Sequence, residues 1–224
     1  MIRLVIFDMD GLMFDTEQIT CRAFMEKGEE YGLPLDKEKF VQILGLNSTS
    51  IISQYQKLYG NRIEGEKLYR EIGRRKQEIL EREGLPVKTG LYELLDAIEK
   101  AGIKKAVASG SDPEVIERFV IDAGLKGRFD MMISSKEVER GKPYPDVFME
   151  ICRQLKVAPA DTLVLEDSNN GVQAAIAGNI PVINIPDLVP LPEELQEQCL
   201  AVKESLLDVI PYISVADILS ANPL

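Results

Sequence analysis

Asp8 and Asp10 are the first residues of the sequence that could do chemistry together. They occur as Asp8-Met9-Asp10-Gly11, directly after the apolar run 4–7. If this run is a buried strand, both acids emerge at its carboxyl end, where α/β sheets bind their ligands. Alternation along extended backbone places the two carboxylates on one side, where a cation between them would relieve their repulsion. In a chain with 37 acidic residues, a solvated loop explains the pair alone equally well.

Hydroxyl groups and a lysine follow two later apolar runs. Ser109, Gly110 and Ser111 come after the run 105–108 and precede a helix start. Hydroxyls and backbone N–H groups at such a point can hold a phosphate, although plain helix capping explains them equally well. Lys142 lies in Gly141-Lys142-Pro143-Tyr144-Pro145-Asp146, a turn that two prolines restrict. An isolated lysine is usually a solvated surface charge, whereas a fixed lysine beside acids is suited to neutralising phosphate oxygens.

A second acidic pair, Glu166 and Asp167, ends the run 162–165. Ser168 is positioned to cap the next helix, but capping does not explain the two acids. Carboxylate oxygens from separate strands suit a hard divalent ion, and Mg²⁺ prefers a few carboxylates, several waters and a substrate phosphate. The sequence therefore predicts a magnesium site.

The composition excludes several functional classes. The sequence has no histidine, which removes Ser–His and Cys–His nucleophilic sites and most zinc sites. A net charge of −11 argues against binding of nucleic acid, although a metal and a few basic side chains can still hold a small phosphorylated metabolite. No apolar run approaches the roughly 20 residues of a membrane span, and no leader pattern is visible. Three widely spaced cysteines fit reduced thiols, so we expect a cytoplasmic protein. The sequence does not indicate an oligomeric state, and a monomer is the default expectation.

The elements that must position these residues follow from the hydrophobic pattern. Apolar runs bounded by turn residues predict strands at 4–7, 105–108, 131–134, 162–165 and 180–185. Helical periodicity lies between the later runs, at 114–123, 146–155 and 171–177. This alternation predicts an α/β fold with a parallel sheet covered on both faces, and all four polar clusters then lie at one edge of it.

A long helical insertion separates the first two predicted strands. An insertion of about 70 residues is too long for an ordinary connection, so we predict that 16–87 forms a small helical cap and that 1–15 and 88–224 form the core. We expect no chemistry in the segment from about 186 to 224. The apolar stripes of the cap are Ile19, Ala23, Phe24 and Tyr31 in one helix and Leu68, Ile72 and Ile79 in another.

Taken together and in this order, the four motifs resemble those of the haloacid dehalogenase superfamily. The insertion after the first motif is similar to that of capped subfamily I, which contains β-phosphoglucomutase and many sugar-phosphate phosphatases. The resemblance covers nearly the whole chain and implies a Rossmann-like core, a central Asp8 strand and a four-helix cap that opens and closes over the site.

The resemblance also implies roles for individual residues. Asp8 is then the nucleophile that attacks phosphorus, and Asp10 is the general acid and base. Ser109 and Lys142 would hold the phosphoryl oxygens. Asp8, Asp167 and the backbone carbonyl of Asp10 would bind Mg²⁺ with support from Glu166. The expected substrate contacts are Gly110, Ser111, Glu17 and Lys76.

Three functions remain open on the sequence. A phosphatase acting on a sugar or polyol phosphate is favoured, because Asp15-Thr16-Glu17 resembles an element of many capped phosphatases. A mutase similar to β-phosphoglucomutase would have a cap histidine and a G-x-S-R element, where this chain has Thr20 and residues 45–48 without an arginine. A binding protein without turnover has no need for a nucleophile beside an acid. Dehalogenation is disfavoured because dehalogenases lack the second aspartate, Asp10. Lys76, beside Arg74 and Arg75, either contacts substrate or belongs to a solvated helix face.

Overall fold

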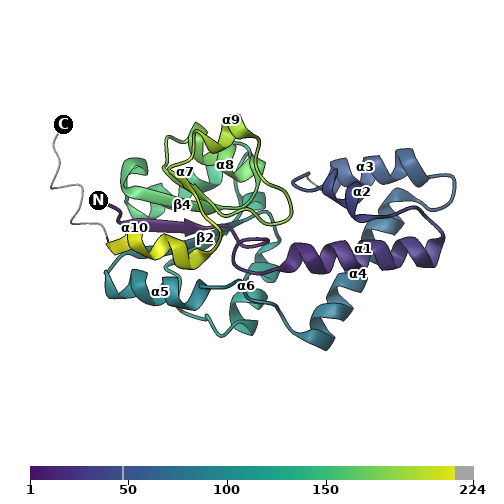
Figure 1. Ribbon diagram of the computed structural model, residues 1–224, viewed down its shortest axis with the longest axis horizontal. Coiled ribbons are helices and arrows are strands. Elements are labelled where there is room, and N and C mark those ends of the chain that lie inside the picture. Colours follow the sequence, from purple (N-terminus) through teal and green to yellow (C-terminus); the bar gives the residue numbers. More distant parts are fainter. Residues whose placement is uncertain (47, 215–224) are drawn as a thin grey trace. The chain divides into compact units, whose positions relative to one another are not determined.

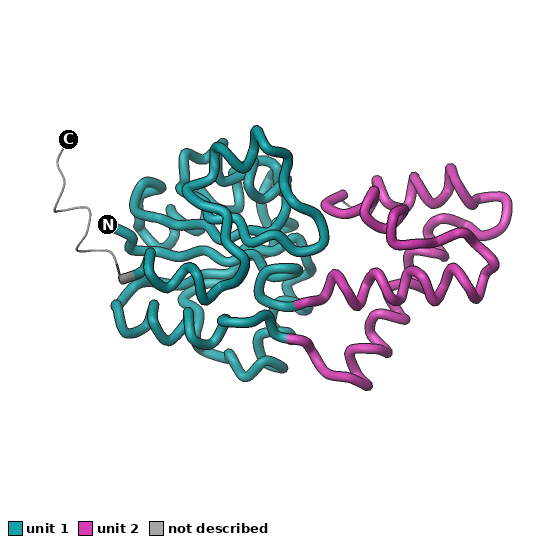
Figure 2. The backbone as a smooth tube through the Cα atoms, viewed as in Figure 1, with its two compact units in different colours: residues 1–14, 87–224 teal, residues 15–86 magenta. Residues whose placement is uncertain are grey.

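The computed structural model describes residues 1–46 and 48–214 as two compact units. The core unit comprises Met1–Phe14 and the chain from Val87 onward, and the helical unit comprises Asp15–Pro86 (Figure 2). Residue 47, one of the four positions compared above with the mutase element, lies outside the described residues. Among the helices that are described, we find none with the length and apolar character needed to span a bilayer.

The core unit is built on a six-stranded parallel sheet. The sequence predicts the parallel sheet and five of its strands, but not the short last strand at Ala201–Val202. The strand order β3-β2-β1-β4-β5-β6 places β1 between β2 and β4. All four residues of β1 are buried, because helices cover both faces of the sheet. A strand buried on both faces has a continuous apolar sequence, as β1 does. The strands are β1 (Leu4–Phe7), β2 (Lys104–Ser109), β3 (Met131–Ser134), β4 (Thr162–Glu166), β5 (Val182–Asn184) and β6 (Ala201–Val202).

The helices of the core unit lie on both faces of the sheet (Figure 1). The chain moves outward from β1 through β2 to β3 and then returns past β1 to β4, so right-handed crossovers place the later helices on the opposite face. The strands up to β3 therefore lie on one side of β1, and those from β4 onward lie on its other side. At such a switch point in an open α/β sheet, ligands bind at the carboxyl ends of the strands. One face carries α5 (Leu91–Lys100), α6 (Pro113–Asp122) and α10 (Ile210–Ser214), and the other carries α7 (Asp146–Leu155), α8 (Asn169–Ala177) and α9 (Glu193–Gln196). Short 3-10 turns occur at Ser135–Glu137, Pro159–Asp161 and Leu206–Val209.

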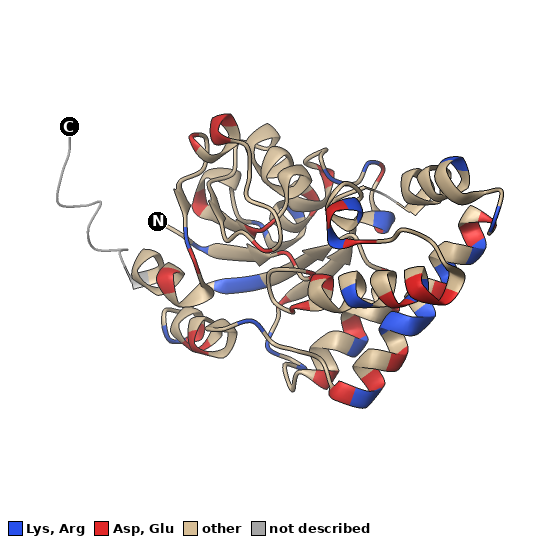
Figure 3. Ribbon diagram, turned by 45° about the vertical axis from the view of Figure 1, so that its right-hand side comes forward, with Lys and Arg blue, Asp and Glu red and all other residues tan. Residues whose placement is uncertain are grey.

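The helical unit contains four helices within the described residues: α1 (Thr16–Tyr31), α2 (Lys37–Val41), α3 (Ser48–Tyr59) and α4 (Gly65–Glu83). Both predicted stripes form its interior, except that Tyr31 is only half-buried. The Phe24 ring lies 5.5 Å from that of Phe40 and 6.1 Å from that of Tyr55, measured between centroids. Charged residues of both signs alternate along α1 and α4 (Figure 3), where they form ion pairs.

Candidate active site

Asp8 continues β1 by one residue at the centre of the sheet. Its backbone N–H donates to the Leu165 carbonyl of β4 at 3.0 Å, which extends the pairing of the two strands. The side chain is 12% exposed, and its Oδ1 lies 2.6 Å from Nζ of Lys142. Burial raises the pKa of Asp8 to about 8; Lys142 opposes this increase, while Glu166 and Asp10 add to it. A further cation beside Asp8 would therefore stabilise its ionised form.

Lys142 connects three strand ends. Besides Asp8, its ammonium donates to Oε1 of Glu166 at 2.6 Å and to the carbonyl of Ala108 at 2.9 Å. Its Nζ also lies 5.1 Å from the ring centroid of Phe148 in α7. Burial disfavours the charged ammonium, but Asp8 and Glu166 outweigh this effect and raise the pKa of Lys142. The lysine is therefore a fixed positive charge between two carboxylates.

Glu166 and Asp167 bring two more carboxylates to the same place from the end of β4. Glu166 is fully buried, and its Oε2 accepts hydrogen bonds from the Ser168 N–H at 3.2 Å and the Ser168 hydroxyl at 2.9 Å. Each of Asp8, Glu166 and Asp167 presents one oxygen such that all three oxygens lie within 4.8 Å of one another. Mg²⁺ is a hard cation that takes oxygen ligands, and carboxylate oxygens this close together could hold one.

Gly11 leaves space for the Asp167 carboxylate of this acidic cluster because it has no side chain. Its φ is +87°, a left-handed conformation that glycine adopts without strain, and its N–H donates to the Phe14 carbonyl at 2.8 Å. A Cβ at this position would lie 2.3 Å from Oδ2 of Asp167. Only a residue without a side chain lets the backbone approach the Asp167 carboxylate so closely. The donor set and this cradle both fit a bound Mg²⁺ ion.

Hydroxyl groups line the end of β2. The Ser111 hydroxyl donates to Oδ2 of Asp10 at 2.8 Å, and the Ser111 N–H donates to the buried Ser109 hydroxyl at 3.0 Å. Ser134, at the end of β3, donates its hydroxyl to the Ser111 carbonyl at 2.6 Å. We gave Ser134 no role from the sequence, although it ends a predicted strand as Ser109 does. Gly110 is exposed beside these residues.

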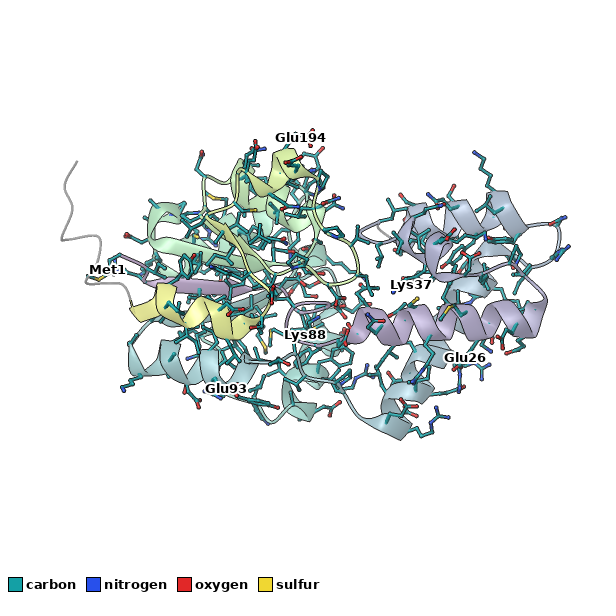
Figure 4. The ribbon with its side chains drawn as sticks, in the orientation of Figure 1. Met1, Glu26, Lys37, Lys88, Glu93 and Glu194 are labelled. Atoms are coloured by element: carbon teal, nitrogen blue, oxygen red, sulfur yellow. The ribbon has the colours of Figure 1, made fainter. Side chains whose placement is uncertain are left out.

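Two predicted site residues lie in the other unit, Glu17 in α1 and Lys76 in α4. Of the basic residues before Lys76, Arg75 binds Glu26, which is labelled on α1 in Figure 4, and Arg74 binds Glu71 at 2.8 Å. Both also bind Glu78. These ion pairs favour the helix-face interpretation for the two arginines.

Asp187 lies near the acidic cluster, although the sequence analysis gave it no role. Asp187 follows β5, in the segment where we expected no chemistry, and its carboxylate lies beside Gly11 and forms an ion pair with Lys88 at 2.7 Å. Asp187 is separated from the predicted apolar run 180–185 only by Pro186, and an acid just after a buried run is the signal that drew attention to Asp8 and Glu166.

The sequence profile of haloacid dehalogenase-like hydrolases matches residues 5–185, and the chain belongs to this family of enzymes. The predicted membership and the prediction of an enzyme are confirmed.

Two proteins to which the chain is similar in sequence are phosphatases. The chain is 29% identical over 177 residues to the phosphorylated carbohydrates phosphatase of Thermotoga maritima. The aligned region covers 79% of this chain and 81% of that protein. It is 28% identical over 185 residues to the fructose-1-phosphate phosphatase YqaB of Escherichia coli, with 81% and 95% covered. Its fold is similar to that of CbbY from Rhodobacter sphaeroides, solved with phosphate, with a TM-score of 0.78, 24% identity and 93% and 96% of the two chains covered.

Proposed function

We propose that the protein is a magnesium-dependent phosphatase that hydrolyses a phosphorylated carbohydrate, a sugar or polyol phosphate, through an aspartyl-phosphate on Asp8. The observation that carries the proposal is the end of β1, where Asp8 is fixed by Lys142 at 2.6 Å and Asp10 by Ser111 at 2.8 Å, beside three convergent carboxylates. The two phosphatase relatives named above support the substrate class.

The reaction has two steps, and Asp8 and Asp10 act in both. In the first, an oxygen of Asp8 forms a bond to phosphorus while the bond from phosphorus to the carbohydrate oxygen breaks, and Asp10 gives that oxygen its proton. In the second, Asp10 takes a proton from water, whose oxygen attacks phosphorus, and inorganic phosphate leaves as Asp8 is regenerated. Covalent catalysis of this kind replaces one difficult displacement with two easier ones.

The residues around Asp8 and Asp10 position the phosphoryl group during its transfer. Lys142 and Ser109 hold the phosphoryl oxygens, with Gly110 and Ser111 alongside, and charge stabilisation of this kind supplies much of the acceleration in phosphoryl transfer. Bound through Asp8, Asp167 and the Asp10 carbonyl, Mg²⁺ would supply positive charge to the phosphoryl oxygens. Glu166 fixes Lys142 and supports the metal site.

The helical unit is proposed to select the substrate. We assign residues 16–87 to a cap over a catalytic core of 1–15 and 88–224, with Glu17 and Lys76 contacting the part of the substrate away from phosphorus. An insertion of this size at the carboxyl end of the first strand is placed where α/β folds keep their ligands.

The test is phosphate release from a panel of sugar, polyol and nucleotide phosphates and phosphoglycolate, with Mg²⁺ and with chelator. We expect Mg²⁺-dependent release, strongest on a few sugar or polyol phosphates, and none from Asp8→Asn. Asp96→Asn is the matched control, because Asp96 is an exposed aspartate of the core unit whose side chain is 71% exposed. Normal release by purified Asp8→Asn would refute the nucleophile. Conversion of a hexose 1-phosphate to its 6-phosphate with a bisphosphate primer, without release, would identify a mutase instead.

A further inference from the structure

Asp187 has one carboxylate oxygen that the protein leaves without a hydrogen-bond donor. Its side chain is only 6% exposed, and Oδ1 accepts from Nζ of Lys88 at 2.7 Å. Oδ2 is buried, and none of the residues in 1–46 and 48–214 donates to it. A buried carboxylate oxygen without a donor costs free energy, so a group outside the protein is expected to supply the hydrogen bond.

The position of this oxygen indicates what that group is. The point that a Cβ of Gly11 would occupy lies 2.3 Å from Oδ2 of Asp167 and 3.4 Å from Oδ2 of Asp187. The two oxygens therefore converge on the same small space. Asp187 does not belong to the cluster of Asp8, Glu166 and Asp167 found within the described chain, whose oxygens lie within 4.8 Å of one another. Its oxygen is placed beside the metal ligands and not among them.

Lys88 holds Asp187 in this position. Lys88, labelled in Figure 4, stands in the segment that leads into α5, and its side chain is 22% exposed. Its backbone N–H donates to the Met13 carbonyl at 2.9 Å, within the turn whose first residue, Gly11, approaches both carboxylates. The lysine is thereby fixed at its backbone and at its ammonium, so that Oδ1 of Asp187 is occupied and Oδ2 faces the metal ligands.

We propose that Asp187 is an outer-shell residue of the magnesium site, positioned by Lys88, and that its Oδ2 accepts a hydrogen bond from a water molecule of the ion's hydration shell. The inference rests on the proposed function, which supplies the metal. Mg²⁺ gives up its waters reluctantly and usually keeps several of them in proteins. Outer-shell acceptors orient such waters, and their loss typically weakens metal binding about 10- to 100-fold.

The experiment is a calorimetric titration of metal-free protein with Mg²⁺, repeated with Mn²⁺. Asp187→Asn keeps the shape and the contact with Lys88 but replaces an acceptor with a donor on one side, and we expect its Mg²⁺ dissociation constant to rise about 10- to 100-fold. Asp96→Asn, which removes the same charge at an exposed ion pair, should bind as the wild type does. If Asp187→Asn does not fold, the double variant Lys88→Met/Asp187→Leu replaces the buried pair with apolar residues, an exchange that proteins often tolerate.

The outcomes separate this inference from the function on which it rests. Weakened binding in Asp187→Asn or in the double variant, with unchanged binding in Asp96→Asn, supports the outer-shell role. Binding within twofold of wild type in the folded Asp187 variants, while Asp167→Asn binds no Mg²⁺, overturns the inference and leaves the proposed magnesium site standing. Absence of Mg²⁺ binding by the wild-type protein overturns both.

Discussion

Gly171 of α8 lies so close to Glu166 at the end of β4 that a side chain at this position would displace the Glu166 carboxylate. Gly171 lies in the first turn of α8, and a Cβ built on it would lie 1.8 Å from both Cδ and Oε1 of Glu166 and 2.2 Å from Oε2. Real Cβ atoms essentially never approach another atom within 3.0 Å. In Gly171→Ala the Glu166 carboxylate must therefore move by more than 1 Å.

That movement breaks the hydrogen bonds that hold Glu166. The carboxylate is fully buried and accepts from Lys142 at 2.6 Å and from Ser168 at 2.9 Å. Hydrogen bonds to charged groups contribute about 1.5–3 kcal/mol each, and the better helix propensity of alanine offsets about 1 kcal/mol. We expect Gly171→Ala to lower the free energy of unfolding by about 2–5 kcal/mol and to reduce turnover, because Lys142 loses one of its anchors.

The assay is urea unfolding followed by circular dichroism, with Gly73→Ala as the matched control. Gly73 is also helical, in α4, but a Cβ there would meet no atom within 4 Å. Gly73→Ala should therefore stabilise the protein by up to about 1 kcal/mol. A Gly171→Ala protein as stable as Gly73→Ala, with wild-type turnover, would show that Glu166 is free to move and would refute the reasoning.

Three further predictions concern single side chains. Asp10→Asn should lower kcat by about 10²- to 10⁴-fold because the proton donor is lost, whereas Ser111→Ala, which removes one orienting hydrogen bond, should cost about tenfold or less. Equal losses in steady-state assays would contradict the distinction. Lys142→Met should destabilise the protein by about 3–5 kcal/mol, since Asp8 and Glu166 would remain buried without their shared cation. Unchanged urea unfolding would rule this out. Phe24→Ala should cost about 3–5 kcal/mol within the helical unit, seen as faster hydrogen exchange in α1 and α4 while β1 and β4 stay protected.

Much of the architecture could be predicted because its signals are local. Each central strand is buried on both faces, so its sequence is a continuous apolar run, and acids or hydroxyls that interrupt such a run mark a strand end. This is how Asp8, Ser109 and Glu166 were found. The shortest strand, β6, has two residues and no pattern of its own, and the predicted strand 180–185 contains the observed β5 (Val182–Asn184) with extra residues at both ends.

The partners of these residues were decided only by the tertiary structure. Lys142 binds Asp8, 134 residues away in sequence, and also Glu166, and the choice depends on strand order and on the turn that carries the lysine. The pairing of Lys88 with Asp187 spans 99 residues and places an acid that the sequence analysis overlooked beside Asp167 and Gly11. Local patterns report which side chains are buried and where strands end, because burial and backbone conformation act over a few residues. Which strand ends become neighbours is fixed by the packing of the whole sheet, and that packing converts separate polar clusters into one site.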